Sequence, residues 1–208
     1  MKLMKIKICG LNPTRDVQTC LDLNVQFLGF VFYNKSPRNT DLKEISVLKR
    51  YKPKTSHYVS VCVDPTDTFI QENILGNFEY IQLHGSEASE RVKKIKNMGI
   101  KVIKAIKIKE QKDVALYKNY EDVADLILFD STAMEKSQSI PKDLLHKLPK
   151  GEKFGLAGAI NLENIKEYSQ LGFNFLDLSS GLERENLKGY KDHLKIKNFI
   201  NKVNELKN

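Results

Sequence analysis

The chain has 208 residues, of which 41% are hydrophobic, and it carries a net charge of +8 at pH 7. This length and apolar content suit a folded domain with one sizeable core, and they argue against an intrinsically disordered chain. Cys9, Cys20 and Cys62 lie far apart and form no CxxC pair, which argues against a disulfide scaffold and a structural zinc site. We expect Cys20 and Cys62 to be small core residues.

Lysine supplies most of the positive charge, and the lysines are spread over every expected helix. This distribution is typical of a solvated surface, whereas nucleic-acid sites usually favour arginine. No apolar stretch approaches the ~20 residues that a membrane helix needs, and the lysine-interrupted start of the chain is unlike a signal peptide. We therefore expect a soluble, cytoplasmic protein with no nucleic-acid or membrane partner, whose charge attracts an anionic substrate.

Short apolar runs alternate with amphipathic helical patterns from one end of the chain to the other. Asn12 before Pro13 and Asn161 before Leu162 are typical helix starts, and apolar residues recur at helical spacing in residues 88–98 and 196–203. The expected strands, in chain order, are residues 6–9, 27–32, 57–63, 80–83, 101–106, 125–129, 153–157 and 175–178.

Tight connections from strand to helix, followed by helices that cross back, imply a parallel sheet. Eight strand–helix units in so short a chain suit a closed barrel, although periodicity alone leaves an open doubly wound sheet as an alternative. No Gly/Ser-rich or Pro-rich linker divides the chain. The sequence therefore predicts an α/β fold, a single (β/α)8 (TIM) barrel domain over residues 1–208.

Polar residues or glycines follow six of the expected strands, at the end of a barrel where active sites form. These segments are Cys9-Gly10, Tyr33 to Arg38, His84-Gly85, Asp130-Ser131, Gly158-Ala159 and Ser179-Ser180-Gly181. Their recurrence on one face of the predicted barrel indicates a single site.

Cys9 and Asp130 are the candidate proton carriers. The Cys9 thiol serves as a base if a nearby positive charge lowers its pKa, and otherwise it is a small buried hydrophobe. Asp130 closes an apolar run, so that a raised pKa would make it an acid, while a helix N-cap is the alternative.

The other candidates would bind substrate. Arg38 suits a carboxylate, or else it is a surface arginine. His84 either contacts substrate or satisfies the barrel rim, and Asp177 either orients a hydroxyl or pairs with Lys7 or Lys104. Glycines allow backbone amides to approach a phosphate, although they also form ordinary turns; the phosphate candidates are Gly158, Ser180 and Gly181. No histidine or carboxylate spacing matches a metal-ligand set, so we expect no metal.

Together these segments resemble the phosphoribosylanthranilate isomerase family of tryptophan biosynthesis. The resemblance runs in order along nearly the whole chain, through Lys7-Ile8-Cys9-Gly10-Leu11, Leu28-Gly29-Phe30-Val31-Phe32-Tyr33, Lys35-Ser36-Pro37-Arg38, Gln82-Leu83-His84-Gly85, Leu128-Phe129-Asp130, Leu156-Ala157-Gly158, Asn161-Leu162-Glu163-Asn164, Asp177-Leu178-Ser179-Ser180-Gly181-Leu182-Glu183 and Lys191-Asp192-His193.

The resemblance implies a cofactor-free Amadori rearrangement of N-(5-phosphoribosyl)anthranilate to 1-(2-carboxyphenylamino)-1-deoxyribulose 5-phosphate. It further implies that Asp130 is the general acid, that Cys9 is the general base and that Arg38 grips the anthranilate carboxylate. Gly158 and Ser180-Gly181 would contact the phosphate, and Asp177 would be an auxiliary site residue. We expect a phosphorylated small-molecule substrate and a monomer or homodimer.

One segment departs from the family pattern. After Asp130 the family usually has a glycine-rich stretch and then Phe-Asp-Trp, whereas this chain reads Met134-Glu135-Lys136-Ser137 and then Ile140-Pro141-Lys142. A lid of different stiffness or shape is therefore expected over the substrate.

Two other function classes fit parts of the pattern. A barrel with the same phosphate site could epimerise a sugar phosphate or isomerise a histidine-pathway ribonucleotide, but the first reaction would need metal ligands and the second an aspartate in place of Cys9. A barrel that only binds a phosphorylated ligand would need neither Cys9 nor Asp130.

Overall fold

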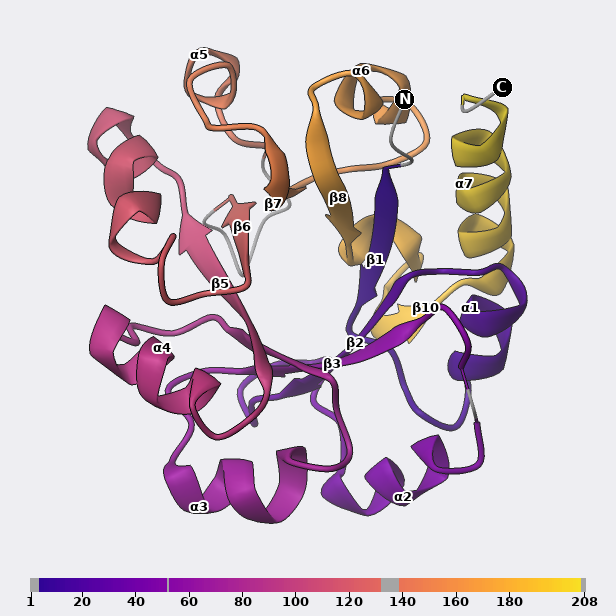
Figure 1. Cartoon of the computed structure of the whole chain (residues 1–208). Helices are drawn as coiled ribbons and strands as arrows, with labels where there is room; N and C mark the ends of the chain where they lie inside the picture. The colour runs from indigo at the N-terminus through magenta and orange to yellow at the C-terminus, as the bar shows by residue number, and fades with distance from the viewer. Residues whose placement is uncertain (1–3, 52, 132–138, 207–208) are drawn as a thin grey trace.

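The computed structural model describes residues 4–51, 53–131 and 139–206. Within these residues, eight parallel strands pair in chain order from β1 to β8, and β8 pairs with β1, so that the sheet closes into a barrel. The helices lie outside the ring of strands (Figure 1). The predicted (β/α)8 barrel is confirmed, and the open doubly wound sheet is excluded, because an open sheet would leave two edge strands.

The barrel strands are β1 (Lys5–Cys9), β2 (Phe27–Phe32), β3 (His57–Cys62), β4 (Tyr80–Leu83), β5 (Lys101–Lys107), β6 (Leu126–Asp130), β7 (Gly151–Ala157) and β8 (Phe173–Leu178). The α-helical segments are α1 (Val17–Asp22), α2 (Ile45–Leu48), α3 (Asp67–Phe69), α4 (Ser89–Lys96), α5 (Lys142–Leu145), α6 (Ile165–Ser169) and α7 (His193–Glu205). A π-helical segment, η2 (Ile70–Ile74), continues α3. The 3₁₀ segments are η1 (Leu42–Glu44), η3 (Gln111–Asn119) and η4 (Ser180–Leu182). A two-stranded antiparallel hairpin, β9 (Glu183–Arg184) and β10 (Leu187–Lys191), follows β8 and was not predicted.

Every expected strand is present, and the predicted ends differ from the observed ones by at most two residues. The strand expected at residues 153–157 begins two residues earlier, at Gly151. Gly151 and Glu152 are exposed and belong to β7 only through backbone pairing, so hydrophobic periodicity cannot reveal them.

The two helix starts predicted at asparagines are wrong by several residues, because each asparagine caps a turn that precedes its helix. Asn12 Oδ1 accepts hydrogen bonds from the backbone amides of Thr14 and Arg15, at 2.9 and 3.0 Å, and α1 begins only at Val17. Asn161 makes the same kind of turn before α6. A side chain that binds nearby amides therefore gives the same sequence signal for a turn as for a helix N-cap.

Aromatic side chains fill the inside of the barrel at the end where the strands begin, opposite the mouth. The Phe27 ring centroid lies 5.6 Å from that of Phe175 and 5.5 Å from that of Tyr80. Gly155 makes room for this cluster, since a Cβ there would lie 2.2 Å from the Phe175 ring. The apolar floor excludes water from one end of the barrel and leaves the polar groups at the other end.

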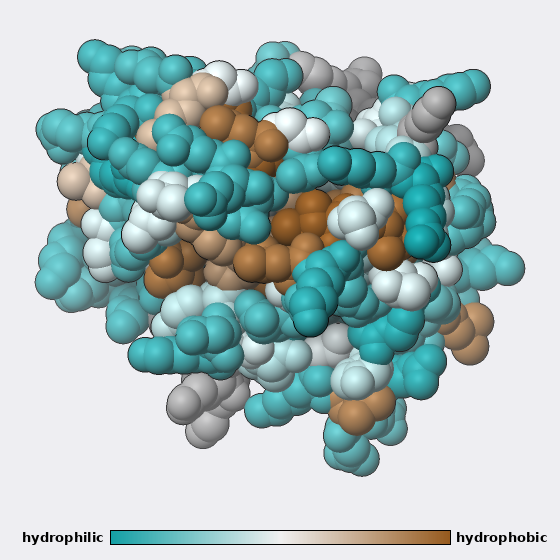
Figure 2. Space-filling model, turned by 90° about the horizontal axis from the view of Figure 1, so that it is seen from below, coloured by the Kyte–Doolittle hydropathy of each residue, from teal (hydrophilic) through white to brown (hydrophobic). Residues whose placement is uncertain are grey.

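A second hydrophobic core lies between the strands and the surrounding helices, and it includes buried residues of α4 and α7. Cys20 and Cys62 are buried, as predicted. Viewed from the side where α2 and α3 lie, the surface is mostly hydrophilic, with hydrophobic residues gathered near its middle (Figure 2). No helix in the described parts of the chain combines the length and apolarity needed to cross a membrane.

We predict that Gly155→Ala lowers the free energy of unfolding by about 1–3 kcal/mol, because the added methyl group overpacks the Phe175 ring. Chemical denaturation of the purified protein measures this change. In a Phe175→Leu background the same substitution should cost clearly less, since the ring that it meets has been removed. Equal costs in both backgrounds would contradict the packing argument.

Candidate active site

The mouth of the barrel, where the strands end, contains side chains that the sequence analysis selected. Cys9 ends β1, Asp130 ends β6, and His84 directly follows β4. His84 Nε2 lies 3.2 Å from Asp130 Oδ2. The charge of Asp130 raises the pKa of Asp177 in β8, and that of His84 lowers it. The charge of Asp177 in turn raises the pKa of Cys9. Residues from four separate strands therefore share one site.

Asp177 is buried, and its two oxygens have different surroundings. Oδ2 accepts a hydrogen bond from Lys7 Nζ at 2.8 Å, across a register pair of β1 and β8. Lys7 is thus the partner, while the alternative, Lys104, pairs with Glu87 at 2.6 Å. Oδ1 is buried without a hydrogen-bond partner among the residues that the structure describes. Burial raises the pKa of Asp177, and the adjacent Lys7 charge opposes this rise.

Cys9 lies beside Gly29 of the neighbouring strand β2. A Cβ at position 29 would lie 3.2 Å from Lys7 Nζ and 3.3 Å from Cys9 Sγ, so the ammonium and the thiol occupy the space that this glycine leaves. Burial raises the pKa of the Cys9 thiol; Lys7 and Lys191 oppose the rise, and Asp177 adds to it. The low thiol pKa that the sequence analysis required of a base is therefore not present in this arrangement.

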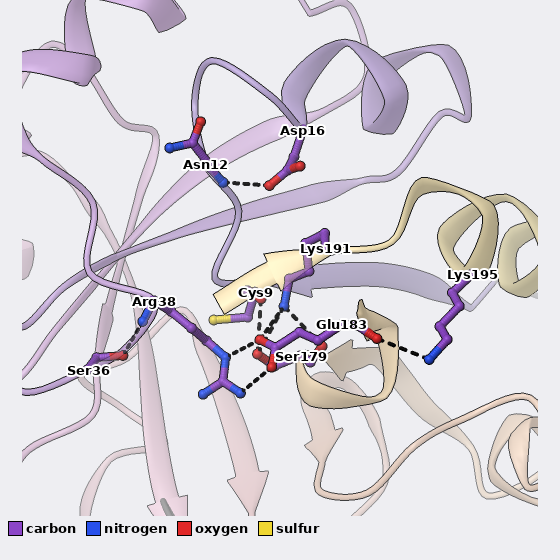
Figure 3. Close-up of polar contacts among 9 residues, drawn as sticks. All are labelled: Cys9, Asn12, Asp16, Ser36, Arg38, Ser179, Glu183, Lys191 and Lys195. Carbon is purple, nitrogen blue, oxygen red and sulfur yellow. Dashed lines mark hydrogen bonds and ion pairs between the residues drawn. The ribbon is translucent and has the colours of Figure 1, made fainter. Parts of the chain in front are cut away.

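Arg38 extends from the loop after β2 to a buried carboxylate in the hairpin, Glu183 (Figure 3). Its Nε and Nη2 donate to Glu183 Oε1 and Oε2, at 2.5 and 3.0 Å. The aliphatic part of Arg38 packs on Gly10, where a Cβ would lie 2.5 Å from Arg38 Cδ. Arg38 is therefore a fixed group and not a loose surface arginine, and a ligand carboxylate would meet the opposite edge of its guanidinium, which carries Nη1.

Lys191 of β10 pairs with the same carboxylate. Its buried Nζ lies 3.2 Å from Glu183 Oε1 and donates to the Ser179 carbonyl at 3.0 Å, while Ser179 Oγ donates to the Cys9 carbonyl (Figure 3). Burial alone would raise the pKa of Glu183, but Arg38 and Lys191 outweigh it and hold the pKa below its usual value. The hairpin thus links the Arg38 loop to the end of β1.

A cavity of about 200 Å³ opens beside the ends of β7 and β8, and its lining includes Ser180 and Gly181. A Cβ on Gly181 would lie 2.6 Å from the Ile160 carbonyl oxygen, so the two loops approach each other as only glycine allows. Gly158 and Ala159, at the end of β7, have positive φ angles of 104° and 50°. Two of the predicted phosphate residues, Ser180 and Gly181, thus line one small cavity, and Gly158 directly precedes Ala159 in its lining.

Sequence reasoning missed the structural roles of two buried pairs, Glu183–Lys191 and Glu87–Lys104. Glu183 and Lys191 were noted only as part of the resemblance, without a function. Lysines such as Lys7 and Lys104, in the middle of apolar runs, are the signal that could have pointed to buried partners. Of the segment that departs from the family pattern, residues 134–137 lie outside the described residues, while Ile140 and Pro141 directly precede α5 and Lys142 begins it.

A closed parallel barrel with a thiol, two carboxylates and a histidine at its mouth, next to a glycine-lined cavity, defines a barrel enzyme equipped for acid–base chemistry on an anionic ligand. The comparisons with known proteins give the family. The profile of the N-(5′-phosphoribosyl)anthranilate isomerase family matches residues 6–202.

Individual relatives agree with this match. The N-(5′-phosphoribosyl)anthranilate isomerase of Aquifex aeolicus is 33% identical, covering 97% of this chain and 98% of that protein. The crystal structure of phosphoribosyl anthranilate isomerase from Thermotoga maritima superposes with a TM-score of 0.84 at 27% identity, covering 97% of this chain and 99% of the other. A phosphoribosyl anthranilate isomerase in complex with reduced 1-(o-carboxyphenylamino)-1-deoxyribulose 5-phosphate superposes with a TM-score of 0.80, also at 27% identity, with the same coverage. The chain belongs to the phosphoribosylanthranilate isomerase family.

The Arg38–Glu183–Lys191 cluster predicts a pH dependence of stability. Because the pKa of Glu183 is lower in the folded protein than its ordinary value of 4.5, the cluster stabilises the fold fully above pH 4.5. This contribution disappears as the pH falls through the lower, folded-state value. Glu183→Gln should therefore cost roughly 3 kcal/mol at pH 7, where it leaves Lys191 without its charged partner, and much less near pH 3.

Urea denaturation at the two pH values measures both costs. Glu185→Gln is the matched control, because this glutamate lies in the same hairpin with an 88% exposed side chain. We expect it to match wild type at both pH values. A cost for Glu183→Gln that is the same at pH 7 and pH 3 would contradict the assignment.

Proposed function

We propose that this isomerase converts N-(5′-phosphoribosyl)anthranilate to 1-(2-carboxyphenylamino)-1-deoxyribulose 5-phosphate, with Asp130 as the general acid and Cys9 as the general base. The observation that carries this assignment is the meeting of Cys9, Asp177, Asp130 and His84 at one barrel mouth. Neither a metal nor an organic cofactor is needed, since both steps are proton transfers at a positioned sugar.

The reaction balances with these two groups. The protonated carboxyl of Asp130 gives its proton to the ring oxygen as the C1′–O bond breaks, which leaves an open-chain iminium ion and the Asp130 carboxylate. The Cys9 thiolate removes the C2′ proton, and the electron pair of that bond forms the C1′–C2′ double bond of a neutral enolamine. Tautomerisation of the enolamine gives the ketose. Proton exchange through solvent returns both side chains to their starting forms.

His84 and Asp177 support these steps in the proposal. The ring of His84, whose Nε2 lies 3.2 Å from Asp130 Oδ2, fixes the direction of the acid. The unpartnered Oδ1 of Asp177 accepts a hydrogen bond from a hydroxyl of the ribose. A buried acceptor without a partner is costly, and a substrate hydroxyl removes that cost.

The two ends of the substrate bind on different sides of the mouth. The phosphate enters the cavity beside β7 and β8, near Gly158, Ser180 and Gly181. The anthranilate carboxylate binds the outer edge of Arg38, because Glu183 holds the inner edge. The sugar then lies between the two anchors, over the acid and the base.

We predict that Asp130→Asn and Cys9→Ala each lower kcat by at least ~10², because each removes one positioned proton carrier. Steady-state turnover of freshly generated phosphoribosylanthranilate, followed by fluorescence, measures this. Circular dichroism and thermal unfolding check that the variants remain folded. Turnover like that of the wild type in either variant removes that residue from the mechanism, and a wild-type protein without turnover removes the proposed function.

We also predict that Arg38→Ala raises KM roughly ten- to a hundredfold with a smaller effect on kcat, since the carboxylate is held both before and during the reaction. Arg184→Ala, which removes an exposed arginine from the same hairpin, is the control and should leave KM unchanged. An unchanged KM for Arg38→Ala would rule out the carboxylate contact.

A further inference from the structure

Lys7 occupies an unusual position for a lysine. It lies in β1 between Ile6 and Ile8, and its side chain is completely buried inside the barrel. Its ammonium group donates to Asp177 at 2.8 Å on one side, and on the other it shares the space beside Gly29 with the thiol of Cys9. Burying an ammonium group costs free energy because it loses its hydration. An ion pair that only stabilised the fold would not need to place this cation beside a second site residue as well.

The thiol needs a partner of this kind. A base must lose its proton before it can take one from C2′, and burial raises the pKa of Cys9. The ionisable groups that act on Cys9 are Lys7, Asp177 and Lys191. Among them, Lys7 does most to lower the pKa of Cys9, and its Nζ lies beside the same glycine as the sulfur.

The neighbouring cation, Lys191, interacts with groups other than the thiol. Its ammonium group lies against Glu183 and the Ser179 carbonyl, and Figure 3 shows the sulfur of Cys9 pointing away from this cluster. Lys7, by contrast, lies beside the same glycine as the sulfur, within 3.2 Å of the position of a Cβ on Gly29. Gly29 therefore allows the close approach of ammonium and thiol.

We propose that Lys7 is a positioning residue for the general base: its ammonium group stabilises the thiolate form of Cys9 beside C2′ of the substrate, while Asp177 holds Lys7. This inference rests on the proposed function, in which Cys9 is the base. Asp177 then has two tasks: its Oδ2 anchors the ammonium, and its Oδ1 receives the sugar hydroxyl.

The test measures the ionisation of Cys9 directly, without using turnover. The folded protein is alkylated with iodoacetamide between pH 6 and 10.5, and modification of Cys9 is quantified by mass spectrometry. The buried Cys20 and Cys62 serve as internal references, and Cys9→Ala provides the blank. In Lys7→Met the pKa of Cys9 should rise by ~1–3 units, so that alkylation at pH 8 slows by about tenfold or more.

The matched control is Lys104→Met. Lys104 is also a buried lysine in a buried ion pair, with Glu87, but it is not among the groups that act on Cys9. This variant should leave the alkylation profile within about twofold of wild type. The proposal is overturned if Lys7→Met and Lys104→Met give the same profile, because Lys7 would then only stabilise the fold.

A second variant protects the test against misfolding. If Lys7→Met does not fold, Lys7→Met/Asp177→Asn removes both buried charges together and should still slow alkylation at pH 8, because the influence of Lys7 on Cys9 exceeds that of Asp177. An unshifted profile in this variant also overturns the proposal. Failure of the proposed function is seen separately, as undiminished turnover in Cys9→Ala, and it leaves the alkylation result unaffected.

Discussion

Buried charge at the mouth of the barrel is the constraint on which the site depends. Three lysines with almost completely buried side chains, Lys7, Lys104 and Lys191, lie in or beside this region, and each is paired with a buried carboxylate. Removing an ammonium group from water is expensive, so each lysine is tolerated only because its carboxylate partner, joined by backbone carbonyls at Lys104 and Lys191, replaces the lost hydration. The carboxylates must in turn lie where they do, which fixes the loops that carry them.

The hairpin after β8 shows how this constraint shapes the site. Glu183 and Lys191 lie at the two ends of the hairpin. Gly189, between them, lets the hairpin approach the loop before Arg38, because a Cβ on Gly189 would lie 2.3 Å from the Pro37 carbonyl oxygen. The inner edge of Arg38 is therefore occupied by the protein's own carboxylate. The cluster keeps a net positive charge, because two cations share one anion, and this residual charge is what an anionic ligand meets.

Hydrophobic periodicity was sufficient to predict the eight strands, because strands buried on both faces read as apolar runs separated by helical patterns, but the choice of a closed barrel over an open sheet also needed the short length of the chain. It failed at Gly151, where pairing is through the backbone alone, and at Asn12, where a capped turn resembles a helix start. The hairpin escaped prediction for a similar reason: β9 has only two residues, and β10 is largely exposed, so neither carries an apolar pattern.

The site residues could be selected from the sequence because polar groups at strand ends converge once a barrel is assumed. What the sequence could not give is which charges face each other, since the pairs Lys7–Asp177 and Arg38–Glu183 are 170 and 145 residues apart. The pKa of the Cys9 thiol could not be predicted from the sequence for the same reason. Its direction depends on the balance between burial and three charged neighbours, which only the fold assembles.

The proposed acid and base lie in environments of opposite character. The side chains of Asp130 and His84 are 20% and 26% exposed, so water can return a proton to the acid between turnovers. Cys9 is also partly exposed, but its thiol lies beside an ammonium group that is 0% exposed, and this fixed cation favours a thiolate. An acid–base pair works only when one member keeps its proton and the other has lost it, and in the proposed mechanism the cation beside the thiol, absent from the carboxyl, separates the two roles.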